Sequence, residues 1–155
     1  MTEPLLFWRF ISSSLDRLVA CLDGLGADEL NWRPPAPGAN SLYALAVHTL
    51  GNAEENILET LGGQAVGRDR ETEFAASGDS FAEVAARWRE LRERLARTLT
   101  DLPAGALEAE YPHPRRGNVT GRAILIVVAR HAAEHLGQAE LTRDLAHAAG
   151  PGQTT

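Results

Sequence analysis

The stretch that decides the fold is TGRAILIVVARHAAEHLGQAELTRDLAHA, residues 120–148. Its apolar residues recur every three or four positions, which is the spacing of one face of an α-helix. Thr120 can cap such a helix at its start. We therefore expect one long helix, on which His131 and His135 stand four residues apart and lie one above the other on the same face.

The histidine pair allows two interpretations. A histidine on a helix is often an ordinary core or surface residue, and pairs occur by chance. In this helix, however, imidazoles and an amide stand where a packed core prefers leucine, and burying two imidazoles without partners would be costly. Two imidazoles alone hold a transition metal poorly, so a metal site would need a third ligand, for which His48 is the best candidate. The expected stripe comprises Ile124, Val128, His131, His135, Gln138, Thr142 and Leu145.

Three earlier segments show the same helical spacing, and none of the chain convincingly predicts a strand. The segments between them are rich in proline, glycine or polar residues and are expected to be connections. Four amphipathic helices imply an all-α four-helix bundle, a fold in which facing helices supply the ligands of metal sites. The helices are expected at about residues 4–25, at 41–61 after a cap at Asn40 or Ser41, at 80–99 after a capping box, and at 120–148, and the connections at 27–40, 64–79 and 104–118.

His48 lies either at one edge of the buried face of the second helix or on its polar side. Asn52, Glu55 and Glu59 share its face, and a solvated face is the default expectation for such a run. If a metal is present, Asn52 or Glu55 could instead support a ligand or contact a substrate. The sequence leaves their roles and that of Gln138 open. His113 and His147 are expected to be solvated, and Glu134 lies on a different side of its helix from His131.

Composition limits the classes of function. The 155 residues fit a single domain over residues 1–150 with a flexible tail at 151–155. Cys21 is the only cysteine and is expected to be a small buried residue in a reducing compartment. A net charge of −6 argues against a nucleic-acid partner. Neither a signal peptide nor a membrane-spanning apolar run is evident, so we expect a cytoplasmic protein.

Three features together resemble the DinB superfamily and its relatives among the bacillithiol and mycothiol S-transferases. They are the segment LNWRPPAPGANSL at residues 30–42, His48 seven residues after Ser41, and the pattern His131-x-x-x-His135-x-x-Gln138. The resemblance implies a four-helix bundle in up-down-down-up order. It also implies a divalent metal, zinc or nickel in most such proteins, held by His48, His131 and His135. Leu136 departs from the arginine that many members carry before Gly-Gln.

The resemblance suggests an enzyme in which the metal activates a low-molecular-weight thiol such as mycothiol or bacillithiol. The reaction would be transfer of the thiol to a small electrophilic substrate or a thiol-dependent isomerisation, and no catalytic residue is assigned. The alternative is a non-enzymatic metal or small-ligand binding module, which could form a homodimer through its helix faces. A third interpretation is a bundle without a metal.

Overall fold

The computed structural model describes residues 1–150, so the predicted tail at 151–155 lies outside the described residues. The chain is mostly helical, as predicted. Its long helical segments are α1 (Glu3–Ala20), α3 (Leu42–Ala53), α5 (Phe81–Thr100) and α6 (Gly121–Ala149). A π-helical segment, η1 (Glu54–Leu61), continues α3 without a break, so the second predicted helix extends to Leu61 as expected.

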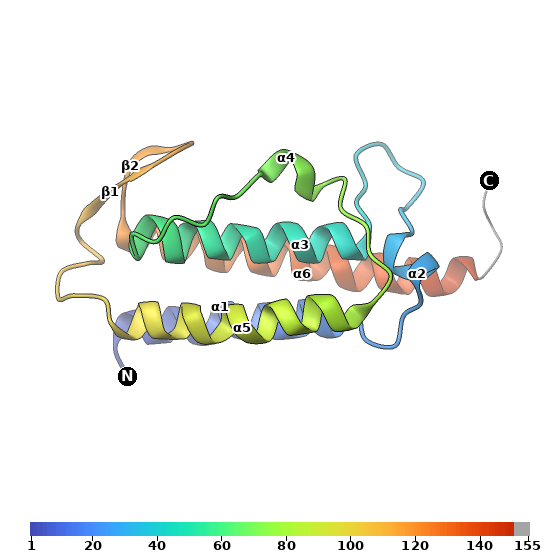
Figure 1. The fold of residues 1–155 in the computed structure, drawn as a ribbon, viewed down its shortest axis with the longest axis horizontal. Helices are drawn as coiled ribbons and strands as arrows, with labels where there is room; N and C mark the ends of the chain where they lie inside the picture. The colour runs from blue at the N-terminus through green and yellow to red at the C-terminus, as the bar shows by residue number, and fades with distance from the viewer. Residues whose placement is uncertain (151–155) are drawn as a thin grey trace.

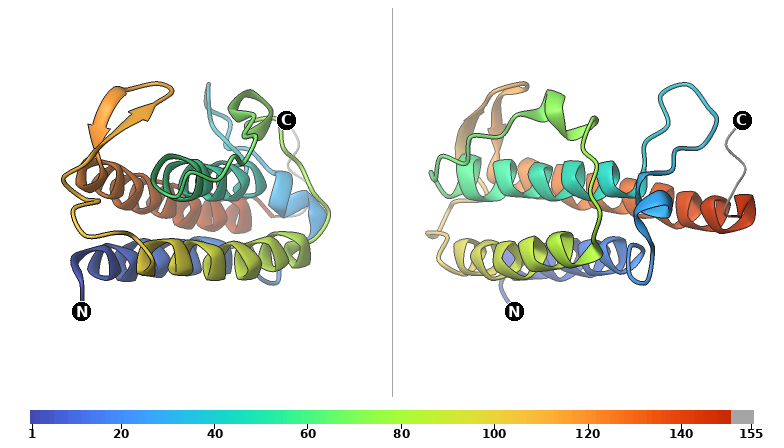
Figure 2. Two further views of the ribbon diagram at one scale, coloured as in Figure 1. Left: turned by 60° about the vertical axis from the view of Figure 1, so that its left-hand side comes forward. Right: turned by 45° about the vertical axis from the view of Figure 1, so that its right-hand side comes forward.

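The long segments pack in two layers (Figure 1), with α3 and α6 in one and α1 and α5 in the other. α1 packs mainly against α6 and α5, and α3 with η1 also packs mainly against α6 and α5. Residues 33–41, 62–80 and 110–120 lie on the outer side of the α3 and α6 layer (Figure 1 and Figure 2). This side is therefore the one on which connecting segments can complete a site.

Side-chain caps fix the starts of three of the long helices. The hydroxyls of Ser41, Ser80 and Thr120 each accept a hydrogen bond from a backbone N–H in the first turn of α3, α5 and α6. Each cap satisfies one of the amides that a helix leaves unpaired at its N-terminus. The predicted caps at Ser41 and Thr120 are confirmed, whereas Glu83, expected to complete a capping box with Ser80, instead accepts from the hydroxyl of Tyr43 at 3.1 Å.

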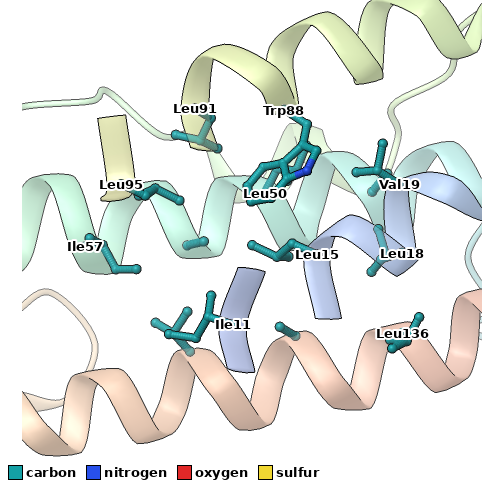
Figure 3. Close-up of a cluster of buried hydrophobic side chains, with 14 of the residues drawn as sticks. Ile11, Leu15, Leu18, Val19, Leu50, Ile57, Trp88, Leu91, Leu95 and Leu136 are labelled. Carbon is teal, nitrogen blue, oxygen red and sulfur yellow. The ribbon is translucent and has the colours of Figure 1, made fainter. Parts of the chain in front are cut away.

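The core lies between the two layers, where leucine and isoleucine side chains from all four long segments meet Trp88 (Figure 3). Cys21 is buried beside this core, as predicted. Trp8 and Phe81 are partly buried against it. The fully buried large side chains include Ile11, Leu15, Leu18, Leu50, Ile57 and Leu95.

Two connections contain short helices. α2 (Ala27–Asn31) forms the single short turn expected in the proline-rich loop after α1. Residues 62–80, which we call the strap, include α4 (Arg70–Glu73) and run along the outside of α3 (Figure 1). The strap packs against α3 through α4.

The link before α6 is a β-hairpin, which corrects the expectation that the chain has no strand. β1 (Glu110–His113) pairs antiparallel with β2 (Gly117–Thr120), with Glu110 opposite Thr120 and His113 opposite Gly117. Each strand has only four residues, and β1 contains Pro112, so neither carries the alternating run by which strands are recognised. The hairpin ends directly at the cap of α6.

The buried stripe of α6 also differs from the predicted one. Ala132, Leu136 and Ala139 face the core, while His131 and His135 lie half-buried beside them. Gln138 and Leu145 are exposed. The two histidines therefore do not replace core residues; small and apolar neighbours fill the core, and the imidazoles border it.

Among residues 1–150, no helix combines the length and the apolar character needed to cross a membrane.

Gly121→Ala should destabilise the protein, because the new Cβ would collide with the backbone carbonyl of Ala106, which cannot move aside as a side chain can. We expect a loss of about 1–3 kcal/mol in the free energy of unfolding, measured by urea denaturation. Gly137→Ala on the same helix is the matched control, since its Cβ would meet no atom within 4 Å. The control should gain roughly 0.5–1 kcal/mol from helix propensity. Equal stabilities of the two variants would contradict this account of the packing.

Candidate metal centre

Three histidines from the α3 and α6 layer converge on one point. His48 comes from α3, and His131 and His135 come from adjacent turns of α6. The Nε2 atom of His131 lies 3.1 Å from Nε2 of His48 and 3.1 Å from Nε2 of His135. The three ligand atoms lie within 4.8 Å of one another. The structure thus brings together the three predicted residues, with His48 the most deeply buried at 4% exposure.

A carboxylate from the strap fixes the orientation of His48. Oε2 of Glu73 lies 2.8 Å from Nδ1 of His48, and both side chains are buried. Burial would raise the pKa of Glu73, but hydrogen bonds from His48 and Arg68 outweigh it and hold the pKa below its ordinary value. An ionised carboxylate can only accept hydrogen bonds, so Nδ1 of His48 must carry a proton and donate it. The Phe74 ring covers the same imidazole at a centroid distance of 4.5 Å.

Arg68 joins the strap to the helix beneath it. Its guanidinium donates to both oxygens of Glu73, each at 2.7 Å, and to Glu55 of η1 at 3.0 Å. Arg115 of the hairpin also donates to both oxygens of Glu55. Burial would raise the pKa of Glu55, yet these arginines keep it lowered. The buried cluster therefore connects α3, η1, the strap and the hairpin.

The two histidines of α6 are uncharged at neutral pH. Burial, and then the neighbouring His135 and His48, lower the pKa of His131 to about 3. Burial also lowers the pKa of His135, although its bond to Gln138 opposes the shift. Nδ1 of His135 lies 2.7 Å from Oε1 of Gln138, whereas the buried Nδ1 of His131 has no hydrogen-bond partner among the described residues. A neutral imidazole is the form that binds a metal.

The protons available cannot satisfy the contacts between the three rings. Nε2 of His131 faces two other Nε2 atoms, and one ring nitrogen carries at most one proton, so it can donate to only one of them. A cation accepts lone pairs from all three at once. Ring nitrogens lie roughly 2.0–2.1 Å from a bound zinc ion, so neighbouring ligands are roughly 3–3.5 Å apart. The three residues therefore fit a divalent ion and leave a further coordination position for water or substrate.

The remaining predicted residues divide between the site and the surface. Asn52, one turn after His48, is buried, and its Oδ1 has no partner among the described residues. The burial of Asn52 and of Glu55 corrects the default expectation of a solvated face, whereas Glu59 is exposed in line with it. Glu134 is exposed and lies 3.5 Å from Arg130, and His147 is exposed as expected.

His113 is buried, at 5% exposure, which corrects the expectation that it is solvated. Its Nε2 lies 3.2 Å from Oδ1 of Asn56 in η1, and its Nδ1 accepts from the backbone N–H of Arg115. The two flanking prolines suggested an exposed turn, but they lie in and beside a hairpin that folds His113 onto η1. A cavity of about 190 Å³ lies beside this contact, between η1, the hairpin and α6.

Sequence reasoning missed Glu73 and Arg68. Both lie in a polar connection, where charged residues are expected to be solvated, and their spacing does not distinguish them from the exposed Asp69, Arg70 and Glu71 beside them. Only the path of the strap over α3 reveals that these two side chains point inward.

A helical protein with three convergent histidines belongs to the class of bundles that can hold a metal between facing helices. The family model of the DinB superfamily matches residues 11–139, so this chain belongs to that superfamily. A crystal structure described as the conserved protein of locus from Enterococcus faecalis has the same fold, with a TM-score of 0.74 and 18% identity. The match covers 96% of this chain and 99% of that one. No curated protein matches the sequence.

The stability of the metal-free protein should fall as the pH is lowered, and part of this fall should depend on His113. Burial, and then the charge of Arg115, lower the pKa of His113. The unfolded chain therefore binds a proton on this residue below about pH 6.5, where the folded protein does not, so protonation favours unfolding.

His113→Gln should accordingly lose less stability than the wild type between about pH 7.5 and about pH 5.5. The measurement is the urea midpoint of each protein at both pH values, with a chelator present. The relevant quantity is the change in the urea midpoint of each protein between the two pH values, because the substitution also changes the bond to Asn56 at both. An equal fall in both proteins would show that His113 does not contribute.

Proposed function

We propose that this protein binds one divalent metal ion through His48, His131 and His135 and uses it to activate a low-molecular-weight thiol against a small electrophilic substrate. The observation that carries the proposal is the convergence of three Nε2 atoms whose contacts cannot all be satisfied by protons. Membership of the DinB superfamily supports the same assignment.

A divalent ion held there would lower the pKa of a bound thiol or water and stabilise its anion. The chain's own residues keep the ligands neutral and in place. Burial keeps the imidazole of His131 neutral, and Glu73 holds the proton of His48 on Nδ1, the nitrogen that faces away from the site. Three imidazoles suit zinc and nickel, the two metals that the resemblance implies.

The thiol would come from a cofactor, not from the protein. Cys21 is buried, and burial raises the pKa of its thiol, which leaves it less reactive. Transfer to an electrophile and thiol-dependent isomerisation both need an activated thiolate, and both belong to this proposal.

A non-enzymatic metal-binding module is the second candidate, favoured by the state of the two buried carboxylates. Glu55 and Glu73 are the buried glutamates among the described residues, and both are bound to Arg68. Neither is free to exchange a proton with a substrate. Chemistry at this site would therefore depend on the thiol itself, and without a thiol the protein would only bind the metal.

The remaining sequence predictions concern the order of the helices, the number of domains, the oligomeric state and the location. The up-down-down-up order of the long helices is supported by the strap, which runs along the bundle between η1 and α5 (Figure 1). The single domain, the homodimer and the cytoplasmic location remain predictions from the sequence.

Purified protein should contain one zinc or nickel ion per chain by elemental analysis, and His131→Ala should lose it, because a site with two imidazoles binds weakly. His147→Ala is the control, since that histidine is exposed and lies at the end of α6. Metal-free wild type, or equal metal content in both variants, would refute the metal site.

The metal-loaded protein should also conjugate a thiol to a generic electrophile such as a chlorodinitrobenzene, with mycothiol, bacillithiol and glutathione tested in parallel. His48→Ala and chelation should each abolish the rate above background. Metal binding without turnover on any of the thiols would favour the binding module.

A further inference from the structure

Glu73 belongs to no long helix and to no predicted site, yet it is among the most buried charged residues of the protein, at 6% exposure. It ends α4, in the middle of the strap. Two features bring it to His48: a partner that holds its carboxylate and a gap in the helix surface that admits it.

The partner is Arg68, whose planar guanidinium binds both carboxylate oxygens at 2.7 Å. This fork fixes the direction as well as the position of the carboxylate. Arg68 is itself held by Glu55 at 3.0 Å, and its Nη2 lies 3.4 Å from both the backbone carbonyl oxygen and Nδ1 of His48. The shorter 2.8 Å contact of Nδ1 is the one to Glu73. The pair is thus tied to the same turn of α3 that carries the metal ligand.

The gap is Gly51, three residues after His48. A Cβ at this position would collide with Oε1 of Glu73 and would lie 3.2 Å from Nε of Arg68. Gly51 is in an ordinary helical conformation, so the glycine is required by the close approach of the strap and not by the backbone. The helix surface is therefore shaped to receive the Arg68 and Glu73 pair.

Glu73 is also the only one of the two Nδ1 partners that fixes a tautomer. Gln138 carries both a carbonyl and an amide group, so it can pair with His135 in either tautomer. The carboxylate of Glu73 can pair with His48 only when Nδ1 carries the proton, which leaves the lone pair on Nε2. That lone pair is directed at the point where Nε2 of His131 lies, 3.1 Å away.

We propose that Glu73 is a positioning residue of the three-histidine site, and that its carboxylate, held by Arg68 across Gly51, keeps the Nε2 lone pair of His48 directed at the metal position. The inference rests on the proposed metal site and deepens it, because it makes the strap part of the metal centre. Partners of this kind orient metal-binding histidines and usually change metal affinity by roughly 10–100-fold.

Two substitutions test the proposal without altering a ligand. Glu73→Leu removes the acceptor, and Gly51→Ala displaces the carboxylate, which can move because it is the end of a flexible side chain. Glu71→Leu is the control, since its side chain lies in the same short helix and is 90% exposed. The zinc dissociation constant of each protein is measured by competition with a chromophoric chelator, and circular dichroism verifies the fold.

We expect zinc binding to weaken by roughly 10–100-fold in Glu73→Leu and Gly51→Ala and to stay unchanged in Glu71→Leu. Unchanged affinity in the first two variants, with zinc bound by the wild type, would overturn the role of Glu73 while leaving the metal site intact. Failure of the wild type to bind zinc would instead refute the proposed function.

A measurement on the metal-free protein tests the role of Glu73 even if the wild type does not bind zinc. Nitrogen-15 NMR of the His48 ring, recorded where the ring signals show a neutral imidazole, should show the proton on Nδ1 in the wild type. Glu73→Leu should move it to Nε2, the nitrogen preferred by a free imidazole side chain, while Glu71→Leu should not. A proton on Nε2 in the wild type, or no change in Glu73→Leu, would overturn the proposal.

Discussion

The hydrogen bond between Glu73 and His48 is the interaction on which the candidate site depends. A carboxylate cannot donate, so the 2.8 Å contact determines which nitrogen of His48 carries the proton and which faces the α6 histidines. The other two rings are set by the helix to which they belong, since residues four apart lie on one face. The site is therefore built from two regular helices, α3 and α6, and the irregular strap, and only the strap determines which nitrogen of His48 carries the proton.

Burying the ions that hold this bond is expensive. Arg68, Glu55 and Glu73 are withdrawn from water together, and Arg115 supplies the second positive charge that balances the two carboxylates. Desolvation of such groups cancels most of their mutual attraction, so an apolar cluster of the same volume would serve stability equally well. The balance of energies favours a role in positioning over a role in stability. Small apolar residues such as Ala132 and Ala139 pack beside the histidines, so the core there does not depend on the polar cluster.

The regular parts of the fold could be predicted from sequence, because apolar spacing and capping residues are local signals. The long helices, the cap at Thr120 and the position of His131 and His135 on one face of α6 follow from residues close together in the chain. His48 needed more than periodicity, since spacing left it between the buried and polar sides of α3, and the resemblance raised it to a ligand. Glu73, Arg68 and His113 could not be predicted, because each becomes buried only when a connection with no periodic pattern folds over η1 or α3.

The π-helical segment explains the last difference between the sequence pattern and the site. In a continuous α-helix Glu55 and Glu59 would share the face of His48. In η1 the hydrogen bonds span five residues, as from the N–H of Gly62 to the carbonyl of Ile57 at 2.9 Å, so the face shifts and Glu59 becomes exposed.

Two consecutive polar residues of η1, Glu55 and Asn56, are buried. Glu55 meets Arg68 and Arg115, and Asn56 meets His113, so one turn of helix receives both the strap and the hairpin. Wide turns of this kind are uncommon and are often found at functional sites. Both covering segments are anchored on this wide turn, about two helical turns after His48.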